Sequence, residues 1–151
     1  MTKGPELRQV KGVLFLDYVR MIRATKGVDF ASHLSPEDLP YLREYIDVGG
    51  WYPMATFERL GNAILRTIAK SDMTAVRAWG RLSVDQLRAQ QPALVTERDP
   101  VETLNRFRVL RSTFFDFDAL KLLFLHENEA HIVIHYHMGM PAEEAASHQT
   151  I

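Results

Sequence analysis

The chain has 151 residues, of which 46% are hydrophobic and 25% are charged; this composition is typical of globular proteins and excludes the disordered, collagen-like and membrane classes. Its 18 basic and 19 acidic side chains give a net charge of −1, which provides no overall attraction for a nucleic acid or an anionic membrane. Cysteine is absent, so disulfides, thiolate metal ligands and cysteine nucleophiles are excluded. We expect a cytoplasmic protein with neither a signal peptide nor a membrane span.

Helical periodicity and capping residues predict five helices before residue 118. Each helix is expected within one of the segments 10–24, 35–50, 51–70, 71–91 and 99–115. The second opens on Ser35 as N-cap with Pro36 at its first helical position, and the third follows a break at Pro53.

The fifth helix has the clearest start signal, with Asp99 as N-cap, Pro100 at the first position and Glu102 three residues after the cap. Its expected inner face is Val101, Leu104, Phe107, Leu110 and Phe114. Arg111 follows Phe107 by four residues and therefore belongs to this inward face. One interpretation is an inward charge that meets a buried carboxylate or an anionic ligand. The other, which we favour, is a side chain at the edge of the core with its head in water, because burying an unpaired charge is costly.

The remainder of the chain changes to the period of a β-strand and predicts a hairpin around Asn128-Glu129. This turn would oppose Leu125 with Ile132, Leu123 with Ile134, and Lys121 with Tyr136. The expected core face is Leu123, Leu125, Ile132, Ile134 and Tyr136. The expected opposite face is Leu122, Phe124, His126, His131, Val133, His135 and His137. Because a sheet of two strands is marginal in water, we expect the hairpin to pack on the helices and to pair with further strands.

These elements predict an α+β fold in which about five helices pack on a C-terminal antiparallel hairpin or small sheet. We expect a single domain over residues 1–151. Its helical part would cover residues 1–117, its β-hairpin part residues 118–140, and a C-terminal tail residues 141–151.

The spacing of His135 and His137 on one strand face is a weak candidate for a metal site. A double-stranded β-helix would place a glutamate closer to this pair than Glu143, and it would need about eight strands, which the helical sequence does not provide. We therefore expect no metal, and interpret these histidines together with His131 as the polar side of a strand.

Four features follow one another along the chain: a helix that opens on KG (residues 11–12), a helix that carries WGR (residues 79–81), a long capped helix, and a hairpin whose second strand ends in IHY (residues 134–136). In this order the sequence resembles the haem nitric-oxide/oxygen-binding (H-NOX) fold, which is related to vinyl-4-reductase-type sensor domains and to subunits of trafficking complexes. The succession of GWYP, a helix, FDFxxLxLLxL and a hairpin is similar to a bacterial family of uncharacterised proteins placed near these sensors. The resemblance covers about residues 10–140 and implies an H-NOX-like arrangement.

The resemblance also implies where a haem would bind, because H-NOX proteins take the iron ligand, a histidine, from the long helix before the hairpin. In this chain that position falls at or near Arg111, which cannot ligate iron because it stays protonated. The tyrosine, serine and arginine that hold the propionates correspond to Tyr136, Met138 and Met140. We therefore expect no haem and no other cofactor.

No nucleotide-binding glycine motif and no serine-hydrolase motif occurs in the sequence, so we expect no enzyme activity. The resemblance favours a sensory or adaptor domain in bacterial signalling, which binds a small apolar or anionic molecule, a partner protein, or both. The candidate ligand-binding residues are Arg111, Phe107, Trp79, Tyr136 and Trp51. For the two tryptophans, sealing of a helix junction or of the core is the simpler interpretation.

Two other classes of function stay open. One is a pure protein-interaction module, such as a homodimer, which has no ligand pocket and uses a hairpin face or a helix face as its interaction surface. The weaker one is a haem- or metal-binding protein, including a metal-dependent enzyme that uses His135 and His137.

Overall fold

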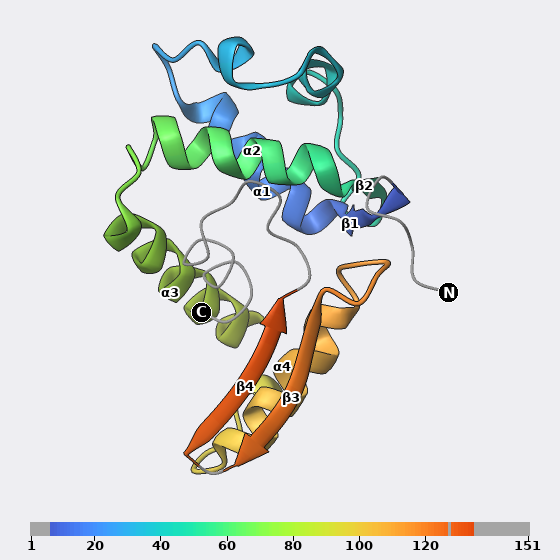
Figure 1. Cartoon of the computed structure of the whole chain (residues 1–151), viewed down its shortest axis with the longest axis vertical. Coiled ribbons are helices and arrows are strands. Elements are labelled where there is room, and N and C mark those ends of the chain that lie inside the picture. The colour runs from blue at the N-terminus through green and yellow to red at the C-terminus, as the bar shows by residue number, and fades with distance from the viewer. Residues whose placement is uncertain (1–6, 127, 135–151) are drawn as a thin grey trace.

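The structure is a computed structural model that describes residues 7–126 and 128–134. It has the predicted α+β class, in which helices dominate and two small antiparallel sheets of two strands each are formed by the described residues (Figure 1). Every segment predicted to be helical contains a helix. None of the described helices is long and apolar enough to cross a membrane.

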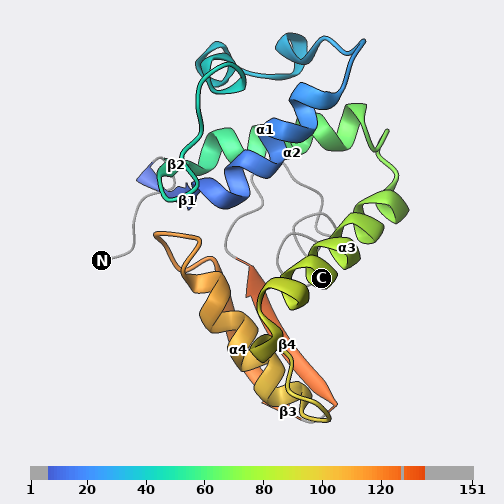
Figure 2. The same ribbon diagram turned by 180° about the vertical axis from the view of Figure 1, so that it is seen from behind.

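The first half of the chain forms a body of two strand–helix units. Strand β1 (Gln9–Lys11) runs into helix α1 (Gly12–Ala24), and strand β2 (Trp51–Pro53) runs into helix α2 (Met54–Thr67). The two strands pair antiparallel, with Val10 opposite Tyr52, so the two helices start together and lie side by side in both views (Figures 1 and 2). The sequence pattern predicts the helices but contains no signal for these three-residue strands.

Helices α1 and α2 face each other through the apolar stripes that the sequence predicts, and these stripes form the main core. Phe15 and Val19 of α1 and Leu60 of α2 have no exposed surface, as expected for residues at helical spacing on facing stripes. Tyr18 and Phe57 stack across the interface with ring centroids 4.5 Å apart.

Two 3-10 helices, Phe30–His33 and Pro36–Leu42, connect α1 to β2. The second begins after Ser35 as predicted, but it ends well before the predicted stop at Gly49-Gly50. Pro40 lies inside this helix, and because it has no backbone N–H to donate and its ring disfavours α-helical geometry at the preceding residue, it accounts for a 3-10 helix in place of the expected α-helix.

The second half comprises α3 (Met73–Gln90), a 3-10 helix (Pro92–Leu94), α4 (Pro100–Ser112), β3 (Leu120–His126) and β4 (Glu129–Ile134). Asp99 caps α4 as predicted, since its carboxylate accepts a hydrogen bond of 3.0 Å from the backbone N–H of Glu102. Helix α4 lies along one face of the hairpin in both views. Helix α3 joins this half to the end of α2.

The predicted register of the hairpin is wrong. Leu125 pairs with Ala130 and Lys121 with Val133, and an irregularity between Leu122 and Phe124 shifts the pairing. As a result Leu123 is 59% exposed, and Leu122 instead lies opposite Ile132. The run from Leu122 to Leu125 is apolar at every position, so alternation could not assign its faces, and a bulge absorbs one residue.

Two further expectations concern the same sheet. Within the described residues β3 and β4 pair only with each other, so the additional strands that we expected are not found there. His131 is exposed, as expected for the polar side of β4, and its ring lies 2.6 Å from a carboxylate oxygen of Glu129. Tyr136, the predicted partner of Lys121, and the predicted polar-face residues His135 and His137 lie outside the described residues.

The segment that follows α4 links the two halves through backbone hydrogen bonds to β1. The N–H of Lys11 donates to the carbonyl of Phe114 at 2.7 Å, and the N–H of Asp116 donates to the carbonyl of Gln9 at 3.2 Å. This pairing places Phe115 opposite Val10, where it completes the main core.

Candidate functional site

Arg111 lies in the last turn of α4 and is 9% exposed, which makes it one of the few buried charged residues. Its guanidinium carbon lies 5.4 Å from the ring centroid of Phe115, 5.7 Å from that of Phe114 and 6.0 Å from that of Phe107. Guanidinium groups are attracted to aromatic faces at such distances. The predicted inward position of Arg111 is therefore confirmed, whereas the favoured interpretation, a head group in water, is wrong.

Helical spacing and the end of α4 together create this arrangement. Phe107 precedes Arg111 by one turn, and Phe114 and Phe115 follow it by three and four residues, where the helix ends and the chain turns onto β1. The tertiary pairing of Phe115 with Val10 then holds the rings against the main core.

A second arginine lies over the same group of rings. The guanidinium carbon of Arg8 is 4.8 Å from the ring centroid of Phe117, which makes an edge contact of 5.5 Å with Phe115. We call Arg8, Arg111 and the rings of Phe107, Phe114, Phe115 and Phe117 the arginine–phenylalanine cluster. The cluster thus places two planar, permanently charged guanidinium groups beside apolar ring faces.

The arginine–phenylalanine cluster does not suit iron. Arg111, at the position where the resemblance implies the haem ligand, is a permanently protonated group without a lone pair for a metal. Among the residues that the structure describes, no group of three histidine, aspartate or glutamate side chains is arranged to hold a metal ion.

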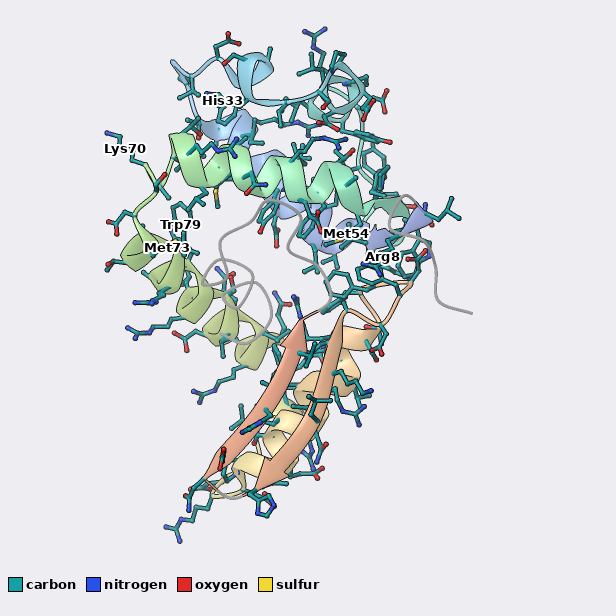
Figure 3. All side chains as sticks on the ribbon, viewed as in Figure 1. Arg8, His33, Met54, Lys70, Met73 and Trp79 are labelled. Atoms are coloured by element: carbon teal, nitrogen blue, oxygen red, sulfur yellow. The ribbon has the colours of Figure 1, made fainter. Side chains whose placement is uncertain are left out.

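The two predicted tryptophans, which the structure describes, do not join this cluster. Trp79 on α3 is half-buried against Leu65, Ala69 and Val76, beside Met73, which confirms its interpretation as a core residue (Figure 3). Trp51 on β2 is 41% exposed and packs beneath the ammonium group of Lys11, 4.6 Å from the ring centroid. Tyr136, His135 and His137 lie outside the described residues. Of the four candidates within the described residues, the structure brings Arg111 and Phe107 together.

Tyr52, the neighbour of Trp51, is the residue that packs into the helix junction. The ring of Tyr52 stacks on Phe15 with centroids 4.7 Å apart, and its hydroxyl accepts a hydrogen bond of 2.7 Å from the backbone N–H of Asp47. The inner aromatic residue thus fixes the turn, and the outer one is left on the surface.

Around this turn lies an exposed apolar surface that the sequence analysis missed. Its residues are Val13 (39% exposed), Tyr45 (86%), Val48 (52%) and Trp51 (41%), and we call them the turn patch. Val13 and Trp51 stand at helix and strand positions, so their exposure follows from the tertiary arrangement and has no signal in the sequence beyond the GGWYP stretch.

The turn patch has a rigid backbone because the turn closes the N-terminus of α1. The N–H of Gly12 donates to the carbonyl of Gly50 at 2.9 Å, and the N–H of Val13 donates to the carbonyl of Val48 at 3.1 Å. These two bonds satisfy helix N–H groups that have no partner within the helix. The turn approaches so closely that a Cβ atom on Gly12 would lie 1.8 Å from the carbonyl oxygen of Asp47.

An ion pair between the buried Asp38 and the partly exposed Arg59 holds the 3-10 helix Pro36–Leu42 on α2. Arg59 donates to both carboxylate oxygens of Asp38 at 2.7 Å, and the hydroxyl of Thr56 donates to one of them at 2.8 Å. Burial by itself raises the pKa of Asp38, but these hydrogen bonds, another from the N–H of Ser35, and the charge of Arg59 outweigh it and lower the pKa. The carboxylate is fully saturated with donors, so this network is structural.

Comparison of the chain with protein-family models, with curated proteins and with solved structures gives no significant match. The relationship to H-NOX-like proteins therefore stays a prediction from the sequence.

Proposed function

We propose that the chain is a non-catalytic adaptor domain that associates with a second copy of itself through the turn patch. The observation that carries this proposal is that four large apolar residues in and beside one turn are exposed, on a backbone held by hydrogen bonds to α1. Contiguous exposed apolar surface commonly marks interaction sites, and tryptophan and tyrosine often contribute most to such interfaces.

A second copy suits this surface for two reasons. An apolar patch is complementary to itself, as a two-fold interface requires. Lys11 beside Trp51 and Asp47 in the turn also place opposite charges at the patch, so that each copy offers a cation and an anion to the other.

The experiment is sedimentation equilibrium of the wild type and of the double variant Val48→Glu, Trp51→Glu over a range of protein concentrations. We expect a wild-type dimer and a monomeric variant, because a buried unpaired carboxylate is costly. Leu123→Glu is the matched control, since Leu123 is similarly exposed on β3, away from the patch. A wild type that is monomeric throughout, or a control that dissociates equally, contradicts the proposal.

A second candidate function, which the resemblance implies, is the sensing of a small apolar or anionic molecule beside the arginine–phenylalanine cluster. Benzoate is the probe, because it combines an apolar ring with a charge opposite to that of the arginines. If the cluster binds such a molecule, benzoate raises the melting temperature of the wild type and leaves that of Arg111→Met unchanged. Equal melting curves of the wild type with and without benzoate contradict this function.

We also propose that the protein binds no haem. Haemin added to the purified protein should give no Soret band that persists through gel filtration, since Arg111 occupies the position at which the resemblance implies the iron ligand. A retained Soret band with one haem per chain would overturn this proposal.

A further inference from the structure

Helix α3 contributes little to the core. Val76 is its one fully buried residue, and Met73 and Trp79 are half-buried where the helix meets the end of α2 (Figure 3). The outer side of the helix is exposed over its whole length. The residues on this outer side therefore make no contribution to the core of the described part of the chain.

Three arginines form a row along this outer side. Arg77, Arg81 and Arg88 are all exposed, and at about 100° per residue they fall within an arc of about 40° over a length of about 16 Å. None of the three forms an ion pair with a carboxylate of the part of the chain that the structure describes. Asp85, the single acidic residue of α3, is exposed at about 80° from Arg77, at the border of this row.

An apolar row runs beside the arginines. Ala78, Leu82 and Ala89 are exposed, Leu82 at 56%, and they lie about 100° further around the helix. We call the two rows together the α3 face. A partner that binds this face must therefore offer carboxylates to the arginines and apolar side chains to Leu82 and the alanines.

We propose that the α3 face binds an acidic, amphipathic helical segment of a partner protein. Glutamate or aspartate side chains of the segment would pair with Arg77, Arg81 and Arg88, while its apolar side chains cover Leu82 and the small residues beside it. Alanine at two of the three apolar positions allows the backbone of the segment to approach α3 closely, as small residues do at helix–helix contacts. The charges give selectivity and fast association, and the apolar row gives the buried area.

A nucleic acid would use the same arginines differently. Backbone recognition needs a broad basic surface, whereas here the basic row is narrow, is flanked by an apolar row and belongs to a chain of net charge −1. The α3 face is therefore better matched to a protein segment with carboxylates on one side and leucines on the other.

The test uses a fluorescein-labelled synthetic peptide with glutamate on its polar face and leucine on its apolar face, titrated with the full chain and followed by fluorescence anisotropy. We expect saturable binding that weakens as salt is raised. The triple variant Arg77→Glu, Arg81→Glu, Arg88→Glu should bind at least tenfold more weakly. The control Arg20→Glu, Arg43→Glu, Arg108→Glu has the same change of charge at exposed sites outside α3 and should bind as the wild type does.

A second variant, Leu82→Ser, tests the apolar row without any change of charge and should weaken binding severalfold while circular dichroism shows the helical content unchanged. Three results would overturn the proposal: no binding by the wild type, equal loss in the control triple variant, or equally tight binding of single-stranded poly-uridylate at the same arginines. The double variant Val48→Glu, Trp51→Glu should retain the peptide, which separates this inference from the proposed dimer.

Discussion

Asp38 shows how a single carboxylate joins two segments that are distant in the sequence. It accepts a hydrogen bond from the N–H of Ser35 in its own turn and two from Arg59 on α2, and it has no exposed surface. Its position in the 3-10 helix follows from the Ser35-Pro36 start signal, but nothing in the sequence indicates that Arg59 is its partner.

The lowered pKa of Asp38 predicts a specific dependence of stability on pH. Because the folded pKa lies below the ordinary value of 3.8, the contribution of the carboxylate is complete above that value and is lost as the pH falls through the folded pKa. Asp38→Asn should lower the free energy of unfolding by about 2 kcal/mol at neutral pH, since it removes charged hydrogen bonds. Urea unfolding at several pH values should show the difference from the wild type shrinking only in acid below about pH 4.

The exposed Asp29→Asn is the control for this prediction and should leave the free energy of unfolding nearly unchanged at every pH. A difference between wild type and Asp38→Asn that is constant from neutral pH to strong acid would contradict the assigned pKa direction.

Gly12 is the residue at which the turn and α1 come closest. Gly12→Ala places a Cβ atom against the backbone carbonyl of Asp47, which no side-chain rotation can relieve, so the free energy of unfolding should fall by about 2 kcal/mol or more. Gly49→Ala is the matched control, because its Cβ atom would meet Asp47 at an ordinary contact distance of 3.6 Å. Thermal unfolding of both variants measures the effect, and equal melting temperatures would refute the close approach.

At the scale of elements, capping residues located helix starts well. Asp99 and Pro100 predicted the start of α4, and the structure places the N-cap hydrogen bond as the sequence implies. Glu102 does not complete the predicted capping box. Its carboxylate accepts a hydrogen bond of 2.9 Å from Arg106, one turn later, instead of one from the backbone N–H of Asp99. Caps are predictable because they depend on residues within one turn of each other.

The cap of α4 gives a prediction for this element. Asp99→Ala should lower the free energy of unfolding by about 1 kcal/mol, because the N–H of Glu102 loses its acceptor. Asp85→Ala on the exposed side of α3 removes the same charge without removing a cap and should change the stability by much less. Chemical denaturation followed by far-ultraviolet circular dichroism compares the two, and equal losses would contradict the role of the cap.

The hairpin shows the limit of element prediction. Both strands and the approximate position of the turn were predicted, but the register was not, because Leu122, Leu123 and Leu125 lie in a run that is apolar on both faces. In the structure, Leu122 is half-buried and Leu123 is exposed. Which residue bulges out of such a run is decided by packing on α4 and not by alternation.

At the scale of the whole molecule, burial is concentrated between α1 and α2. Fully buried residues such as Phe15, Val19 and Leu60 belong to these helices, whereas α3 buries only Val76. Local opening requires less free energy where few apolar contacts are lost.

Hydrogen exchange should reflect this uneven burial. We expect the amides of α1 and α2 to exchange most slowly and those in the second half of α3 to exchange much faster under native conditions. Mass spectrometry of peptides that cover residues 12–24, 54–67 and 73–90 measures the rates. Protection of α3 equal to that of α2 would contradict the expected order.

The sequence by itself determined the fold class, the five helical segments, the caps at Ser35 and Asp99 and the inward position of Arg111. Each of these depends on residues close together in the chain, whose spacing fixes a helix face or a capping hydrogen bond. Tertiary structure alone decided the partners: Arg59 for Asp38, the rings around Arg111, the pairing of Lys11 with Phe114 and the exposure of the turn patch. These contacts join segments that are remote in sequence, and no local periodicity encodes which of them meet.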